Sequence, residues 1–225
     1  MKQEICDPDQ LAAQILAAIR ALPVQDTESM RSLRRQFSLN LKQADPAVMF
    51  NLAYKLIDKH SHRWFVYELL RYHKPAFHAI DETEIVALGT GMNSWDSVDS
   101  FARILSGPVW LNGQISNDLI HQWAGSDNVW WRRAALVSTV ALNVRSQGGY
   151  GDTPRTIAVC QLLADDHEDM IEKALSWALR ELVIHDPDAV KLFLSDYDSV
   201  LATRVKREVK NKLTTGLKQP RKPKI

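Results

Sequence analysis

The segment DNVWWRRAALVSTVAL at residues 127–142 has a second version 40 positions later, HEDMIEKALSWALREL at residues 167–182. A weaker copy, HRWFVYELLRY, starts at His62. Paired helices that repeat at about this spacing are typical of HEAT-type solenoids, whose units bury their apolar faces only by stacking. The alignment of the two segments places Trp130 on Met170, Arg133 on Lys173, Ala134 on Ala174 and Val137 on Trp177.

Most of the remaining chain shows the 3.6-residue period of amphipathic helices, and no segment shows a convincing strand pattern. The sequence therefore predicts an all-α fold, a superhelical stack of antiparallel helix pairs. Gly107-Pro108 and Asn112-Gly113 are expected to form turns. Helices are predicted over 8–22, 27–42, 46–57, 62–72, 82–89, from Ser94 onward, 116–124, 127–144, 153–165, 168–185, 188–195 and 198–215.

The chain has 225 residues, which suits one repeat domain over 1–217 followed by a basic tail over 218–225. Its net charge of +1 hides an asymmetry. Residues 203–225 carry nine Lys or Arg against Glu208 alone, a charge of +8, while the remaining 19 basic and 26 acidic residues give −7. A basic segment on an acidic body indicates a polyanion such as nucleic acid, although a solvated tail without a partner has the same composition.

Several classes of protein fit the sequence poorly. The N-terminus, MKQEICDPDQ, carries acid where a signal peptide needs an apolar core, and no stretch is apolar enough to span a membrane, so we expect a cytoplasmic protein. Cys6 and Cys160 have no ligand spacing, and no His, Cys, Asp or Glu cluster suits a metal. We expect a monomer without a metal site.

The stretch NSWDSVD, which ends at Asp99, holds the candidate chemistry. Ser94 is a good helix N-cap, and Trp95 and Asp99 are four residues apart, so they share one helix face. An aromatic ring beside a carboxylate can hold a cationic group. A purely structural interpretation is also open, with Trp95 in the core, Asp96 as a cap and Asp99 paired to Arg103 one turn later.

Three strings together resemble the DNA alkylation repair glycosylases of the AlkD type. These are NSWDSVDS at 93–100, SDNVWWRRAAL at 126–136 and EKALSWALREL at 172–182, in the order and at separations similar to those of the family. The resemblance extends over roughly residues 60–210. Within MRSLRRQFSLNLK the chain departs from the family, because Ser32 or Leu33 stands where the family usually has an aromatic residue and no glycine follows.

The resemblance implies a HEAT-like stack that binds duplex DNA and removes cationic bases such as 3-alkyladenine and 7-alkylguanine, without a metal or nucleotide cofactor. It implies that Asp99 is the catalytic carboxylate and that Trp95 and Trp177 are aromatic walls of the site. It also implies that Arg133 and Arg180 contact the DNA backbone and that Arg133 is a neighbour of Asp99. The charge asymmetry adds four DNA-binding candidates in the last helix: Arg204, Lys206, Arg207 and Lys210. The alternative is a non-catalytic HEAT-like module that binds nucleic acid or protein.

Overall fold

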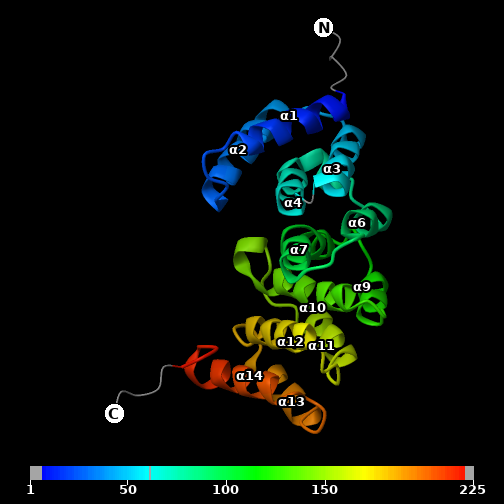
Figure 1. Ribbon diagram of the computed structural model, residues 1–225. Coiled ribbons are helices and arrows are strands. Elements are labelled where there is room, and N and C mark those ends of the chain that lie inside the picture. The colour runs from blue at the N-terminus through cyan, green and yellow to red at the C-terminus, as the bar shows by residue number, and fades with distance from the viewer. Residues whose placement is uncertain (1–6, 61, 221–225) are drawn as a thin grey trace. The chain divides into compact units, whose positions relative to one another are not determined.

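The computed structural model describes residues 7–60 and 62–220, and these residues contain helices and turns but no strand (Figure 1). The all-α prediction is confirmed. The helices cluster into two compact units, Met1–Gly91 and Met92–Ile225, and each unit is described by itself. The prediction of one repeat domain over 1–217 stays a prediction, and the last part of the expected tail, 221–225, lies outside the described residues.

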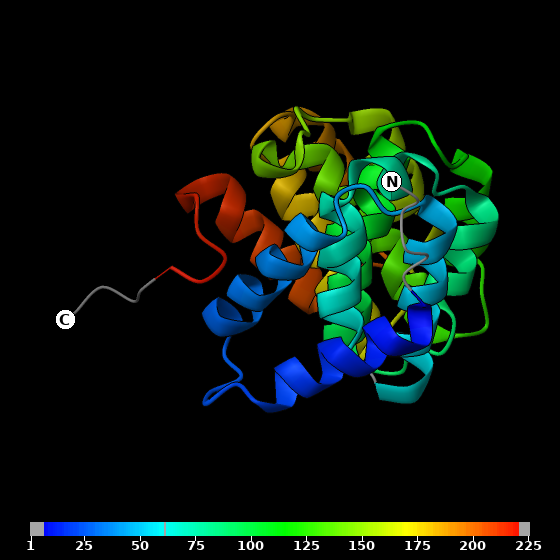
Figure 2. The ribbon, with the colours of Figure 1, turned by 90° about the horizontal axis from the view of Figure 1, so that it is seen from above.

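The first unit is built from helix pairs in which α1 packs on α3 and α2 packs on α4 (Figure 1 and Figure 2). Arg34 of α2 is buried, pairs with Glu68 at 3.4 Å and lies with its guanidinium carbon 4.1 Å from the centre of the Tyr72 ring. The helices are α1 (Pro8–Arg20), α2 (Thr27–Asn40), α3 (Pro46–His60), α4 (Arg63–Tyr72), α5 (Lys74–His78) and α6 (Glu82–Gly89).

The second unit has two layers. In one layer α10 packs on α12 and α12 packs on α14, and in the other α9 packs on α11. Ala134 and Ala174, which the 40-residue repeat aligns, are both fully buried in the helices of the first layer. The helices are α7 (Trp95–Phe101), α8 (Gly107–Leu111), α9 (Asn117–Ala124), α10 (Val129–Asn143), α11 (Thr153–Leu162), α12 (Asp169–Leu182), α13 (Pro187–Asp196) and α14 (Thr203–Thr215).

Two predicted features of the second unit are wrong. Gly107-Pro108 does not form a turn, because a π-helical segment, η1 (Ala102–Ser106), carries the helix directly from α7 into α8. Pro108 lacks a backbone N–H, and the Gly107 N–H bonds to the carbonyl of Ala102, five residues back. The last helix starts at Thr203 rather than at residue 198.

Candidate functional site

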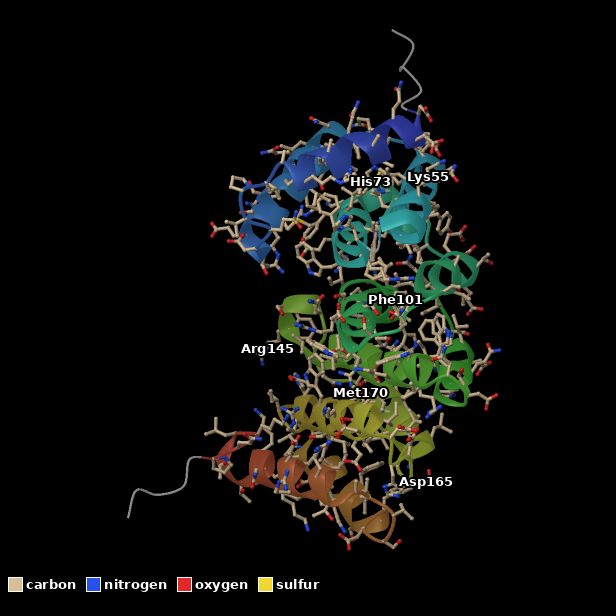
Figure 3. All side chains as sticks on the ribbon, viewed as in Figure 1. Lys55, His73, Phe101, Arg145, Asp165 and Met170 are labelled. Carbon is tan, nitrogen blue, oxygen red and sulfur yellow. The ribbon has the colours of Figure 1, made fainter. Side chains whose placement is uncertain are left out.

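Asp99 and Arg133 form a two-pronged ion pair between α7 and α10. Arg133 donates from Nε to Oδ1 of Asp99 at 2.8 Å and from Nη2 to Oδ2 at 2.9 Å. Its third donor, Nη1, bonds at 2.6 Å to the backbone carbonyl of Met170 in the first turn of α12. Met170 is labelled in Figure 3. The side chains of Asp99 and Arg133 are 17% and 6% exposed, so the pair is largely shielded from water while the carboxylate keeps an accessible edge. Arg133 thus fixes the orientation of Asp99.

A close approach of two helices brings Asp99 to Arg133. Ser106 and Ser138 share a buried hydrogen bond of 2.7 Å. A Cβ atom at Gly107 would lie 2.7 Å from both the Ala141 Cβ and the Ser138 carbonyl oxygen, which is closer than real atoms approach. Only glycine therefore allows this distance between the helix that carries Asp99 and α10.

The three contacts that the structural interpretation predicts for the Asp99 region are wrong. Trp95 is 58% exposed and does not belong to the core. The cap of α7 is Ser94, whose backbone N–H bonds to Ser97 Oγ at 3.3 Å. Asp99 pairs with Arg133 rather than with Arg103, because α10 supplies a fork that satisfies both carboxylate oxygens.

Trp177 lies on α12 with its ring held at one edge. Its Nε1 donates to Glu181 Oε1 at 2.9 Å. The guanidinium carbon of Arg103 lies 5.4 Å from the ring centre, a cation–π contact. The second unit thus places Trp177 beside Arg103 of η1. The sequence indicated Arg103 only as a candidate partner of Asp99.

A basic hollow of about 400 Å³ lies between α12 and α14. It holds six cationic side chains and one buried carboxylate, so it suits an anion such as a phosphate group. Among the described residues, Trp95, Asp99 and Lys210 do not line it. Its lining consists of Arg133, Lys173, Trp177, Arg180, Arg204, Arg207, Glu208, Lys218 and Gln219.

Glu208 is the buried carboxylate of the basic hollow, and it holds neighbouring side chains in position. Its Oε2 accepts from Ser176 Oγ at 2.6 Å and lies 3.4 Å from Lys218 Nζ, and Ser176 Oγ in turn accepts from Arg180 Nε at 3.2 Å. Burial lowers the pKa of Arg180, an effect that the nearby charges of Glu208 and Glu181 oppose. Arg180 is therefore positioned by buried partners while it lines the hollow.

The predicted DNA-binding residues of α14 differ in what they contact. Arg204 donates a hydrogen bond to Asp169 and lies 3.5 Å from Glu172, and the hydrogen bond to Asp169 raises the pKa of Arg204. Lys206 lies 3.4 Å from Asp198. Arg207 and Lys210 are exposed, and of these two only Arg207 lines the basic hollow.

The sequence did not single out Lys173, Lys218 or Glu208 as parts of a site. Lys173 had a signal, because the 40-residue repeat aligns it with Arg133. The only signal for Glu208 was that it is the one acidic residue in the basic segment 203–225. Within the described residues no group of three or more His, Cys, Asp or Glu could hold a metal ion, and no helix is long and apolar enough to cross a membrane.

Comparisons with known proteins give one family. Residues 24–213 match the model of a family described as DNA alkylation repair enzyme. A solved structure of a predicted DNA alkylation repair enzyme from Enterococcus faecalis is similar, with a TM-score of 0.67 and 18% sequence identity, over 92% of this chain and 96% of that chain. At this identity the likeness shows the fold. No curated protein sequence matches the chain.

Proposed function

This chain belongs to the DNA alkylation repair enzyme family, and from that premise we propose that it is a DNA glycosylase that releases cationic alkylated purines from duplex DNA. The observation that carries the proposal is the oriented Asp99 carboxylate, one helical turn after the exposed ring of Trp95. The proposed substrates are 3-alkyladenine and 7-alkylguanine. We also propose that the protein acts on duplex DNA as a cytoplasmic monomer and needs no cofactor.

The chemistry suits a site that holds a carboxylate and aromatic rings. An N-alkylated purine carries positive charge, so it leaves readily with the electron pair of the glycosidic bond and becomes a neutral free base. Positive charge then develops on the sugar, and a fixed carboxylate stabilises it. Water adds its oxygen to C1′ and loses a proton to solvent, which completes the hydrolysis and leaves an abasic site.

In this proposal Asp99 faces the sugar and helps to orient the water, while Trp95 and Trp177 contact the cationic nucleotide. Such ring contacts contribute about 0.5–2 kcal/mol each. Phosphates would lie in the basic hollow, against Arg180 and Arg207. Arg133 serves both parts, because it fixes Asp99 and lines the hollow.

Asp99→Asn tests the catalytic role. The variant keeps the size of the side chain but removes its charge, so single-turnover release of 7-methylguanine and 3-methyladenine from methylated duplex DNA should slow about ten- to a thousandfold, or about 1.4–4 kcal/mol. Its melting temperature should fall as well, because Arg133 loses one of the two carboxylate oxygens that accept its hydrogen bonds in a shielded site. Rates are therefore compared at a temperature where both proteins are folded.

Asp96→Asn is the matched control. Asp96 is exposed on the same helix and loses the same charge, so base release should stay within about twofold of wild type, the small effect expected of a surface charge in salt. If wild-type protein binds duplex DNA but releases no base, the chain is a binding module and the glycosylase proposal fails. If Asp99→Asn releases base at the wild-type rate, Asp99 has a structural role only.

A further inference from the structure

Arg103 already supplies a cation to the ring that the proposed function reserves for a cationic base. Its guanidinium carbon lies 5.4 Å from the centre of the Trp177 ring. The residue is exposed, and within the described part of the chain its side chain makes no hydrogen bond or ion pair. The cation–π contact is therefore what holds Arg103 in place.

The geometry makes this contact easy to exchange. The Trp177 ring is fixed, because its Nε1 bonds to Glu181 and its backbone lies in the middle of α12. Arg103 projects from the η1 segment on a long flexible side chain that solvent reaches. An exposed cation–π contact changes an equilibrium only about two- to fivefold, whereas a guanidinium on a phosphate gains charge-assisted, two-pronged hydrogen bonds. A nearby phosphate would therefore bind Arg103 more strongly than the Trp177 ring does.

The cationic side chains of the basic hollow attract phosphates to the surroundings of Trp177. Trp177 also lines the basic hollow, next to Arg133, Arg180 and Arg207. Duplex DNA bound there brings phosphates close to the ring that Arg103 covers. A cationic base on the ring beside Arg103 would be repelled, so the two cations compete for Trp177.

We propose that Arg103 is a resident cation that covers Trp177 in the free protein and moves to a DNA phosphate on binding. This inference rests on the proposed function, since it takes Trp177 as a wall for a cationic base. The exchange makes the ring available only where a phosphate backbone is present. Free cationic nucleosides, which bring no backbone, then meet an occupied ring, and the protein is selective for damage within a polymer.

The first test uses nucleosides as probes, with 7-methylguanosine as the cationic one and guanosine as the neutral one. For Arg103→Gln, affinity for 7-methylguanosine should rise roughly two- to fivefold relative to affinity for guanosine. Adding Trp177→Leu to Arg103→Gln should remove the gain. Arg145→Gln is the charge-matched control, because Arg145 is exposed in a separate segment, η2 (Arg145–Gln147), and should leave both affinities unchanged.

The second test follows Arg103 to the phosphate. On an undamaged duplex, Arg103→Gln should reduce the slope of log affinity against log salt concentration by about 0.9, and Arg103→Lys should restore most of it. An unchanged slope, or an unchanged nucleoside preference, overturns the exchange. Release of 7-methylguanine by wild-type protein is measured separately. Absence of that release would defeat the glycosylase proposal, whereas its presence with an inert Arg103→Gln would defeat the exchange alone.

Discussion

His73 is a buried residue that both caps a helix and titrates (Figure 3). Its Nδ1 accepts a hydrogen bond from the Ala76 N–H at 3.1 Å at the start of α5, so the neutral ring carries its proton on Nε2. Burial lowers the pKa of His73 below its ordinary value of 6.5, although nearby backbone groups such as Leu41 oppose this effect. Protonation of His73 therefore works against folding.

The lowered pKa of His73 predicts how stability depends on pH. Below pH 6.5 the unfolded chain takes up a proton at His73 while the folded protein does not, so the free energy of unfolding should fall as the pH drops through 6.5. The fall stops below the folded-state pKa, where both states are protonated. His73→Asn keeps an acceptor for Ala76 but does not titrate. Urea unfolding between pH 7.5 and 5 should show a smaller fall for this variant, and equal falls would assign the dependence to other groups.

At the scale of single residues, spacing along one helix did not predict the partner of Asp99. Asp99 and Arg103 are four apart on one helix, so spacing alone favours a pair between them. Arg133 is 34 positions from Asp99 and no local rule connects the two. The family resemblance implied that Arg133 is a neighbour of Asp99, and the structure adds the physical reason, a close approach of helices that Gly107 permits. The roles of Asp99, Trp95 and Trp177 in catalysis stay predictions.

At the scale of elements, the run from α7 through η1 to α8 determines where the candidate site lies. Glycine and proline together usually indicate a turn, so the sequence predicts one at Gly107-Pro108. In the structure Pro108 lies inside one continuous helical run, directly after the π-helical segment η1, whose hydrogen bonds span five residues. The continuous helix depends on tertiary packing against α10, which the periodicity of the sequence does not report. Asn112-Gly113, by contrast, does form a turn, with Gly113 at φ 73°.

Gly107→Ala tests this arrangement. The added Cβ would lie 2.7 Å from the Ser138 carbonyl oxygen, so the two helices must separate, and we expect a loss of about 1–3 kcal/mol in the free energy of unfolding. Base release should slow too, since Asp99 and Arg133 belong to the helices that part. Gly125→Ala is the control, because its Cβ would meet no atom closer than 3.8 Å. Equal stability of the two variants in urea unfolding would contradict the close-packing argument.

At the scale of the whole chain, the 40-residue repeat was enough to predict stacked helix pairs, because the repeat reports directly on shared burial. The division at Gly91 into two compact units had no comparable signal, since none of the three repeated strings begins or ends near Gly91. The structure was also needed to interpret the charge asymmetry. The basic α14 is not a loose tail, because Val205 and Val209 are buried and the helix packs on α12.

That packing decides how DNA binding should be tested. Deleting residues 204–225 would remove buried groups along with the charges, so a change in affinity would have two causes. Arg207 is exposed and lines the basic hollow, and its side chain bonds to no other group in the described residues. Arg207→Gln therefore removes a charge with little effect on folding.

If phosphates occupy the basic hollow, Arg207→Gln should reduce the slope of log affinity against log salt on duplex DNA by about 0.9. Each phosphate that a cation neutralises releases counterions, so the slope counts such contacts independently of base sequence. Lys191→Gln is the control, because Lys191 is exposed on α13 and pairs with Asp188 at 2.8 Å. Its slope should match wild type. Affinity is measured by fluorescence anisotropy from about 50 to 200 mM salt, the range over which such contacts are well resolved. If Arg207→Gln and Lys191→Gln give the same slope, the backbone of DNA does not enter the basic hollow, and binding must use another surface.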